Sequence, residues 1–304
     1  MRIIIGSRAS QLALIQANWV VEQLRRFCPE IAIKKIKTKG DAILDSPLSK
    51  IGGKGLFVKE IEDALLNKEI DLAVHSMKDV PTDLPGGLTI GAVTERLEPR
   101  DVLISKDKCK LNELGRGSLI GTSSPRRKAQ ILAYRGDLKA VDLRGNLSTR
   151  LKKLETTGLS AIVVAAAGLI RMGLRDRIAQ TFPTEIMLPA PGQGALGIEI
   201  RDGDKEIRTL VSNLNEPDSL AAITAERSFL KALGGGCQVP IGALGKVEDR
   251  TLRLQGIVAS LDGTRLLRSK VKGPKEEAEE IGKDLAKTLI NSGAGEILAH
   301  DGQY

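Results

Sequence analysis

The sequence predicts an α/β fold with two doubly wound lobes, followed by a small C-terminal α+β domain with a three-stranded antiparallel sheet. Two successive stretches in which short apolar strands alternate with helical segments predict the two lobes. From Glu216 the pattern changes to a helix, three alternating segments and a closing helix, which predicts the third domain. We therefore expect domain 1 at residues 1–95 and 191–214, domain 2 at 96–190 and domain 3 at 215–304.

Apolar runs and helical spacing predict the elements of the first lobe. A run at residues 2–5 predicts a strand, and apolar residues at helical spacing after Ser10 predict a helix that ends near Leu24. The next elements are predicted as strands at 31–38, 71–74 and 88–93 and a helix at 57–67. Residues 40–55 are rich in Gly, Lys and Ser, which is typical of a loop that could close over a site as a lid.

The second lobe repeats this alternation. Strands are predicted at 118–121, 139–143 and 161–165, and each is followed by a helix. The first of these helices has Ser124 as its N-cap and Pro125 at its first position. The β-α-β-α-β order predicts a second parallel sheet.

The third domain is expected to hold an antiparallel sheet with helices on one face. Its elements are predicted as a helix at 219–232, strands at 241–247, 252–260 and 264–271, and a helix at 275–290. The pair Asp262-Gly263 predicts a hairpin turn between the last two strands.

Composition limits the partners of the chain. Aromatic residues make up only 2% of the 304 residues, which argues against binding of single-stranded nucleic acid by base stacking. The net charge of +8 leaves nucleic acid and small anions as partners. The three cysteines are far apart and odd in number, so we expect no disulfide framework and a cytoplasmic chain. The two histidines are too few for a zinc site, so no metal is expected.

Neither a targeting segment nor a membrane segment is expected. The N-terminus turns polar at Gly6, unlike a signal peptide. The longest apolar run, residues 159–170, is too short to span a bilayer. The stretch 192–197 matches G-x-G-x-x-G, but the residues after it are typical of a strand, whereas a dinucleotide fingerprint must open a helix. We therefore expect no dinucleotide there.

The segment 71–81 joins a buried strand to a polar exit, where open α/β sheets place ligands. Pro81 stops any helix after the strand, so a loop at the strand end is expected to carry His75, Ser76, Lys78 and Asp79. Two interpretations have about equal weight on spacing alone. One is a solvated turn with a surface Lys78–Asp79 pair. The other is a buried carboxylate aimed into a cleft, with Lys78 beside it to set its charge state.

Arginines recur just after predicted strands or at helix N-termini, where guanidinium groups bind carboxylate or phosphate. They are Arg8, Arg126, Arg127, Arg144, Arg150 and Arg171. This recurrence in both lobes favours a small polyanion in an inter-lobe cleft over a solvated basic face or a nucleic-acid groove. For Arg150 a helix-surface ion pair stays open as the alternative.

Cys237 follows three glycines and precedes Gln-Val-Pro. A lone cysteine is most often a small buried apolar residue. On a glycine-rich loop it is instead accessible to a ligand or to covalent modification. A Cys-His hydrolase is not expected, because only His75 could act as the base and nothing orients it.

Motifs along the whole chain resemble those of the porphobilinogen deaminases, also called hydroxymethylbilane synthases, of tetrapyrrole (heme) biosynthesis. They are Gly6-Ser7-Arg8, Lys39-Gly40-Asp41, residues 52–60, residues 75–81, Gly121-Thr122-Ser123-Ser124 with Arg126-Arg127, Leu143-Arg144-Gly145-Asn146, residues 165–169, residues 192–195 and Gly236-Cys237-Gln238-Val239-Pro240. The resemblance implies a cytoplasmic, monomeric transferase with two periplasmic-binding-protein-like lobes. It also implies that four porphobilinogen molecules are joined head to tail, with loss of ammonia, into hydroxymethylbilane.

The resemblance also implies roles for single residues. Cys237 would hold a dipyrromethane cofactor through a thioether, and Asp79 would be the catalytic carboxylate. The other cofactor-binding residues implied are Lys78, Ser123, Arg126, Arg127 and Arg144. The substrate-binding residues implied are Arg8, Ser10, Gln16, Lys50, Arg150 and Arg171. For Lys50 a mobile surface lysine is an equal alternative.

Two other functions stay open at this stage. One is a two-lobed solute-binding module that captures an anionic ligand without chemistry. The other is a nucleic-acid binder with steeply salt-dependent affinity. The porphobilinogen reading expects a small-molecule partner and neither nucleic acid nor membrane.

Overall fold

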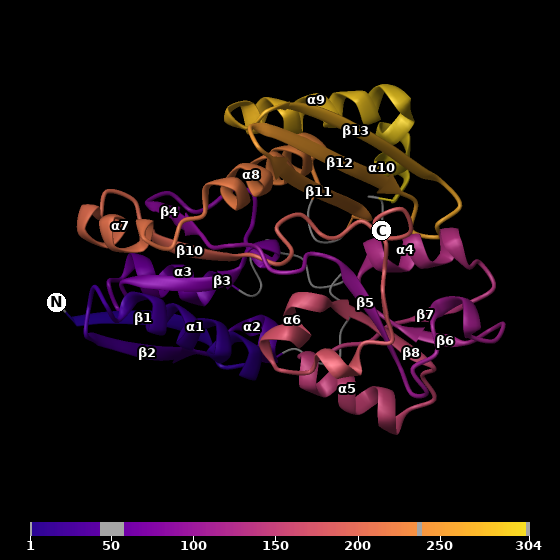
Figure 1. The fold of residues 1–304 in the computed structure, drawn as a ribbon, viewed down its shortest axis with the longest axis horizontal. Helices are drawn as coiled ribbons and strands as arrows, with labels where there is room; N and C mark the ends of the chain where they lie inside the picture. Colours follow the sequence, from indigo (N-terminus) through magenta and orange to yellow (C-terminus); the bar gives the residue numbers. More distant parts are fainter. Residues whose placement is uncertain (1, 43–57, 236–238, 302–304) are drawn as a thin grey trace.

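The computed structural model describes residues 2–42, 58–235 and 239–301, which form three β-sheets with helices packed on them. Figure 1 shows the two lobes side by side, with the sheet of the third domain lying above both. The expected architecture of two α/β lobes and a three-stranded antiparallel sheet is confirmed. In the part of the chain that the structure describes, no helix is long and apolar enough to cross a membrane.

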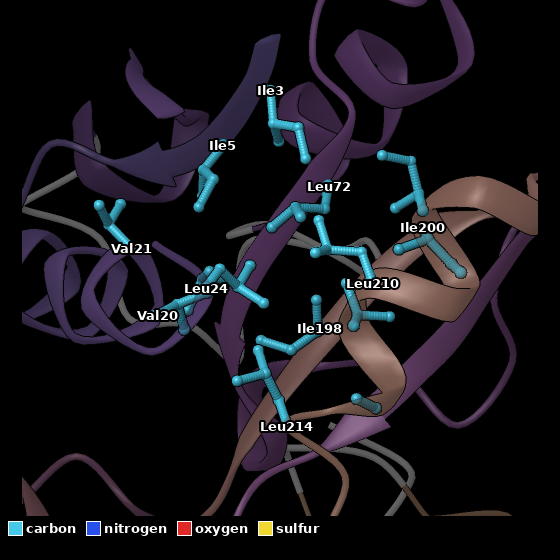
Figure 2. Close-up of a cluster of buried hydrophobic side chains, with 14 of the residues drawn as sticks. Ile3, Ile5, Val20, Val21, Leu24, Leu72, Ile198, Ile200, Leu210 and Leu214 are labelled. Carbon is cyan, nitrogen blue, oxygen red and sulfur yellow. The ribbon is translucent and has the colours of Figure 1, made fainter. Parts of the chain in front are cut away.

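The first lobe has a five-stranded sheet in the order β2-β1-β3-β10-β4. Its strands are β1 (Arg2–Arg8), β2 (Glu30–Ile36), β3 (Leu72–Ser76), β4 (Leu88–Val93) and β10 (Leu196–Arg201). Its helices are α1 (Gln11–Leu24), α2 (Lys39–Ala42), α3 (Lys59–Leu66) and α7 (Lys205–Ser212). Figure 2 shows the core on one face of this sheet, where Ile5, Leu72 and Ile198 meet Leu24 of α1 and Leu210 of α7.

The second lobe repeats the plan in the order β7-β6-β8-β5-β9. Its strands are β5 (Asp101–Ser105), β6 (Leu119–Gly121), β7 (Lys139–Val141), β8 (Ala161–Ala165) and β9 (Gln180–Thr181). Its helices are α4 (Pro125–Tyr134), α5 (Leu147–Thr156) and α6 (Ala166–Arg171). The predicted start of α4 is confirmed, because the Ser124 side chain accepts from Arg127 N and Pro125 is the first helical residue.

The prediction of a wholly parallel second sheet is wrong, because both lobes have mixed sheets. β5 runs antiparallel to β8, and β10 runs antiparallel to β3 and β4. β5 and β10 are the strands that follow the two crossings between lobes, at 94–100 and 189–195. Both parallel sets end toward the junction between the lobes. A strand that enters from the junction therefore has to run against them.

The expected loop at the end of β3 is also corrected, because His75 and Ser76 belong to the strand. The antiparallel ladder pairs Leu196 with Ser76 and Gly197 with His75, so it continues through these polar residues. A single 3₁₀ turn, Met77–Asp79, follows. The strand prediction after the G-x-G-x-x-G match is confirmed, since β10 begins at Leu196.

The third domain packs α8 (Pro217–Ala232) and α9 (Ala278–Leu289) on one face of the sheet β11-β12-β13. The strands are β11 (Ile241–Glu248), β12 (Thr251–Ala259) and β13 (Leu266–Pro274). The predicted hairpin turn is confirmed, with Gly263 at φ +75° and Thr264 N donating to Asp262. The short helix α10 (Gly295–Asp301) was not predicted.

Close contact between α8 and α9 generates a prediction for Gly282. A Cβ at Gly282 would lie 2.4 Å from the carbonyl oxygen of Ala225. Alanine usually stabilises a helix relative to glycine by about 1 kcal/mol. At this crossing we expect the opposite sign, a loss of about 1–3 kcal/mol in Gly282→Ala, because the helices must separate. Denaturant unfolding measures it, and Gly295→Ala, where nothing lies within 4 Å, is the control. Equal stability of both variants would contradict this packing.

A second prediction concerns Glu62 of α3, which is 6% exposed. Burial and the charge of Glu199 raise the pKa of Glu62 to about 7 from 4.5. The folded state therefore binds a proton more tightly than the unfolded state, and its stability falls as pH rises from about 4.5 to 7. Glu62→Gln should remove this slope, worth about 1 kcal/mol per pH unit. Unfolding free energies at pH 5, 6 and 7 test it, and an unchanged slope would refute it. The control is Glu69→Gln, at an exposed carboxylate paired with Lys34.

Candidate active site

Asp79 lies at the junction-facing end of the first lobe, in the 3₁₀ turn after β3. It lines a pocket of about 60 Å³ together with side chains from β1, α1 and β3. The polar members of this lining are Arg8, Ser10, Gln16, His75 and Ser76. The carboxyl ends of β1 and β3 meet at one sheet edge because the two strands are parallel neighbours.

The polar lining of this pocket is held in place by local hydrogen bonds. Ser10 caps α1 by accepting from Ala13 N at 3.3 Å. Gln16, which lies in α1 six residues after Ser10, donates to Ser76 Oγ at 3.1 Å. The predicted substrate-binding residues Arg8, Ser10 and Gln16 are therefore brought together beside Asp79.

Lys78 is half-buried and faces the crossing between the lobes. Its Nζ donates to Gln193 Oε1 at 3.3 Å. Burial lowers the pKa of Lys78 to about 8, and Arg127 adds to the effect, while Asp79 opposes it. This environment differs from a solvated surface pair. The structure therefore argues against a surface Lys78–Asp79 pair, and the half-buried Asp79 lines a pocket with a desolvated Lys78 next to it in the chain.

Arg126 and Arg127, predicted to bind cofactor, both pair with Asp101 of β5. Arg126 Nη1 lies 2.7 Å from Asp101 Oδ2 and also donates to the carbonyl of Leu188 at 2.6 Å. Arg127 donates twice to Asp101 Oδ1, at 3.0 and 2.7 Å. Burial alone would raise the pKa of Asp101, but the two guanidinium groups hold it far below its usual range. Two cations against one carboxylate leave a net positive charge.

Sequence reasoning missed Asp101 and Gln193. Gln193 Nε2 donates to Asp101 Oδ1 at 3.0 Å and to the carbonyl of Pro99 at 2.6 Å. The same side-chain amide accepts from Lys78 of the first lobe, so it connects the first lobe to Asp101 of the second. The signal that could have found Gln193 is the pair of glycines around it, which have φ of +77° and +106°.

The remaining predicted arginines of the second lobe line the same region. Arg150 Nε donates to the carbonyl of Gly145 at 2.8 Å, and no described carboxylate forms the helix-surface ion pair that was the alternative. Burial lowers the pKa of Arg150 to about 10, and Asp79 opposes this shift. The charge of Asp79 in the first lobe therefore acts on a guanidinium group of the second lobe.

Two further arginines differ in how fully they are bonded. Arg171 donates to the carbonyl of Gly194 at 2.9 Å, and burial lowers its pKa to about 10. Arg144 Nη1 is buried and has no hydrogen-bond partner among the described residues. A buried guanidinium N–H without an acceptor favours an anionic ligand at that point.

Ser123 is used locally, since its Oγ accepts from Leu143 N at 2.9 Å and joins the turns after β6 and β7. Two predicted residues, Cys237 and Lys50, lie outside the described residues. The same holds for most of the predicted lid at 40–55, of which only the end of α2 is described.

The third domain is anchored on both crossings by Glu226 of α8. Its carboxylate accepts from Arg96 at 2.5 and 3.1 Å and from Gly192 N at 2.7 Å. Arg96 belongs to the first crossing and Gly192 to the second. A fully buried carboxylate therefore holds α8 against the strands that connect the lobes.

Chemically, the site combines one carboxylate at a strand end with a surplus of cationic groups from both lobes. Such groups suit a ligand that carries several carboxylates. Asp79 in their midst can face positive charge that develops on that ligand. The cationic side chains come together at a junction between lobes rather than along one exposed stripe.

Comparison with known proteins gives the family. Residues 3–209 match the family model "Porphobilinogen deaminase, dipyromethane cofactor binding domain", and residues 220–291 match "Porphobilinogen deaminase, C-terminal domain". The chain is 55% identical to the porphobilinogen deaminase of Pelotomaculum thermopropionicum, over 97% of this chain and 96% of that protein. It is 52% identical to that of Moorella thermoacetica, over 100% of this chain and 99% of that protein.

Among solved structures, the methionine-binding protein MetQ is similar with a TM-score of 0.47 and 13% identity, over 70% of this chain and 89% of that one. From the family matches and the long, full-length similarity, the chain belongs to the porphobilinogen deaminase family, transferases that polymerise porphobilinogen into hydroxymethylbilane in tetrapyrrole biosynthesis.

Proposed function

We propose that Asp79 is the catalytic carboxylate of this transferase and that Cys237 carries a dipyrromethane primer through a thioether. On this primer four porphobilinogen units are added head to tail with loss of ammonia. The observation that carries the proposal is the position of Asp79 in a polar pocket at the lobe junction, among buried cations from both lobes.

The described residues fit a dipyrromethane. Each pyrrole ring bears acetate and propionate groups, and Arg144 Nη1 is a buried donor that lacks an acceptor among the described residues. The residues proposed to hold the cofactor are Lys78, Ser123, Arg126, Arg127 and Arg144. When bound, the cofactor supplies a nucleophilic pyrrole carbon at which the chain grows.

Other residues are proposed to bind the incoming porphobilinogen. They are Arg8, Ser10, Gln16, Lys50, Arg150 and Arg171. Three of the set line the Asp79 pocket, and Arg150 responds to the charge of Asp79 from the other lobe. Their cationic members would pair with the substrate carboxylates. The aminomethyl group would then be left to face Asp79.

Asp79 acts on the charge that develops when ammonia leaves. The substrate pyrrole becomes positively charged, and a carboxylate about 4 Å away would stabilise it by roughly 4 kcal/mol at an effective dielectric of 20. If this is realised only in the transition state, the rate gain is about a thousandfold. The same carboxylate can pass a proton to the amine before it leaves and take one back from the pyrrole carbon after the new bond has formed.

The proposed enzyme is a cytoplasmic monomer. We also propose domain boundaries at 1–95 with 191–214, 96–190 and 215–304, which the three separate sheets support. The proposed partner is porphobilinogen alone, without nucleic acid or membrane. The buried bonds that engage Arg126 and Arg127 make these groups unsuited to a phosphate backbone at the surface.

Asp79→Asn tests the catalytic role. The substitution keeps the shape of the side chain and removes its charge, so we expect turnover to fall by about a thousandfold with little change in stability. Release of ammonia and tetrapyrrole by the purified holoenzyme measures it. Asp107→Asn, at an exposed carboxylate, is the matched control and should keep full activity. Normal turnover of Asp79→Asn would refute the assigned role.

Cys237→Ser tests the attachment of the primer. Protein made in cells should exceed the mass of its polypeptide by one dipyrromethane, and the serine variant should lose this excess because it lacks the thiol. Intact-mass spectrometry measures both, with Cys109→Ser as a control that keeps the added mass. A bare mass in the unmutated protein, with cofactor precursor available, would favour a solute-binding module that performs no chemistry.

A further inference from the structure

Three titratable side chains meet inside the first lobe, under α3, and the reaction as described above does not use them. We call Glu62, His75 and Glu199 the acid–histidine cluster. His75 Nε2 lies 3.0 Å from Glu199 Oε2, and the three residues are 6%, 5% and 0% exposed, respectively. The strand register pairs His75 with Gly197, so Glu199 is its diagonal neighbour on the face covered by α3.

The hydrogen bonding of the cluster is incomplete. Glu62 Oε1 and Glu199 Oε1 are both buried and have no partner among the described residues. A buried carboxylate without donors is costly, and two such groups close together do not both ionise readily. The one bond between the imidazole and Glu199 Oε2 leaves other acceptor atoms of the cluster unbonded. The cluster therefore has room for a proton that moves on and off as pH changes.

The cluster is connected to the candidate active site through His75. The same imidazole that pairs with Glu199 lines the pocket that contains Asp79. Only Ser76, Met77 and Lys78 separate His75 from Asp79 along the chain, and Met77 is fully buried. The electrostatic effect of a charge change in the cluster therefore reaches Asp79 through protein, where it is screened less than in bulk water.

We propose that the acid–histidine cluster sets the charge behind the Asp79 pocket. When the cluster loses a proton to solvent, it gains one negative charge, which favours the positive charge that develops on the substrate as ammonia leaves. His75, Glu62 and Glu199 act through the pocket and do not touch the reacting atoms, so they are positioning residues. The inference rests on the proposed function of Asp79.

The charged groups that act on the cluster come from four elements. On Glu62 they are Glu199 of β10, His75 of β3 and Asp63 of α3 itself. On the other side, Glu199 acts on Arg227 of α8, which donates to the carbonyls of Val80 and Pro81. The faces that β1 and β4 turn to α3 carry the apolar Ile4 and Leu88. Glu62, whose pKa is raised to about 7 by burial and Glu199, is the member expected to titrate near neutral pH.

The first test is the pH dependence of turnover of the holoenzyme between pH 5.5 and 9. In the unmutated enzyme we expect kcat to rise with pH through an ionisation near 7, by about tenfold for a unit charge that acts through protein. Glu62→Gln cannot ionise, so it should match the unmutated enzyme at pH 6 and lack the rise. Glu62→Asp should restore it.

Controls separate this effect from simple damage to the fold. Glu69→Gln removes an exposed carboxylate from the same lobe and should leave the profile unchanged. Lys78 is present in every variant, so its own titration affects all profiles alike. A rise near pH 7 that persists in Glu62→Gln would overturn the proposal. So would a rate that falls by the same factor at every pH, because that result is expected of a purely structural role.

A second readout does not depend on activity. The chain has two histidines, so His300→Gln leaves His75 as the only imidazole, and its ¹⁵N NMR signals can be followed between pH 5.5 and 9. Because His75 lies beside Glu62 in the cluster, its signals should report the ionisation of Glu62 near pH 7, and this response should be absent in Glu62→Gln. Signals that titrate identically in both proteins, or not at all, would overturn the proposal. Full turnover of Asp79→Asn would instead refute the proposed function, while this titration would still report on the cluster.

Discussion

The buried bonds of Asp101 are the interaction on which the rest of the site depends. One carboxylate, fully buried, accepts from Arg126, Arg127 and the amide of Gln193. Gln193 also accepts from Lys78, so the second lobe is joined to the residue beside Asp79. A buried ion pair stabilises a fold little more than apolar packing does. Removal of one partner, however, leaves a buried charge unpaired, which is strongly destabilising. The main effect of the Asp101 bonds is therefore to fix the positions of Arg126 and Arg127, and their contribution to stability is smaller.

The course of the chain explains why these groups meet. The polypeptide crosses from the first lobe to the second before β5 and returns before β10, and each of these strands runs against its neighbours. Asp101 begins β5 and Gln193 precedes β10, so both lie where the crossings pass each other. Glu226 then ties the third domain to the crossings through Arg96 and Gly192. The two lobes and the third domain are thus connected at the place where the ligand is proposed to bind.

The cations of the molecule serve two different purposes. Arg126 and Arg127 have much of their hydrogen bonding satisfied within the second lobe. Arg144 keeps a buried donor without an acceptor, and burial lowers the pKa of Lys78 to about 8. Arg126 and Arg127 hold the architecture and also bring net positive charge toward the proposed cofactor, whereas Arg144 keeps a donor that a ligand can use. The sequence pattern grouped the three arginines together, because spacing indicates that a cation follows a strand and not which groups the cation contacts.

The sequence by itself determined the features that depend on only a few consecutive residues. The Ser124-Pro125 helix start, the Asp262-Gly263 turn, the three antiparallel strands and the polar exit after β3 all depend on local conformational preference and periodicity. Tertiary structure alone decided that Arg126 meets Asp101, that His75 belongs to the strand and meets Glu199, and that the sheets are mixed. His75 and Glu199 are 124 positions apart, and their contact exists only because β10 returns from the other lobe to pair with β3. No local pattern encodes such a contact, since it depends on which strands become neighbours.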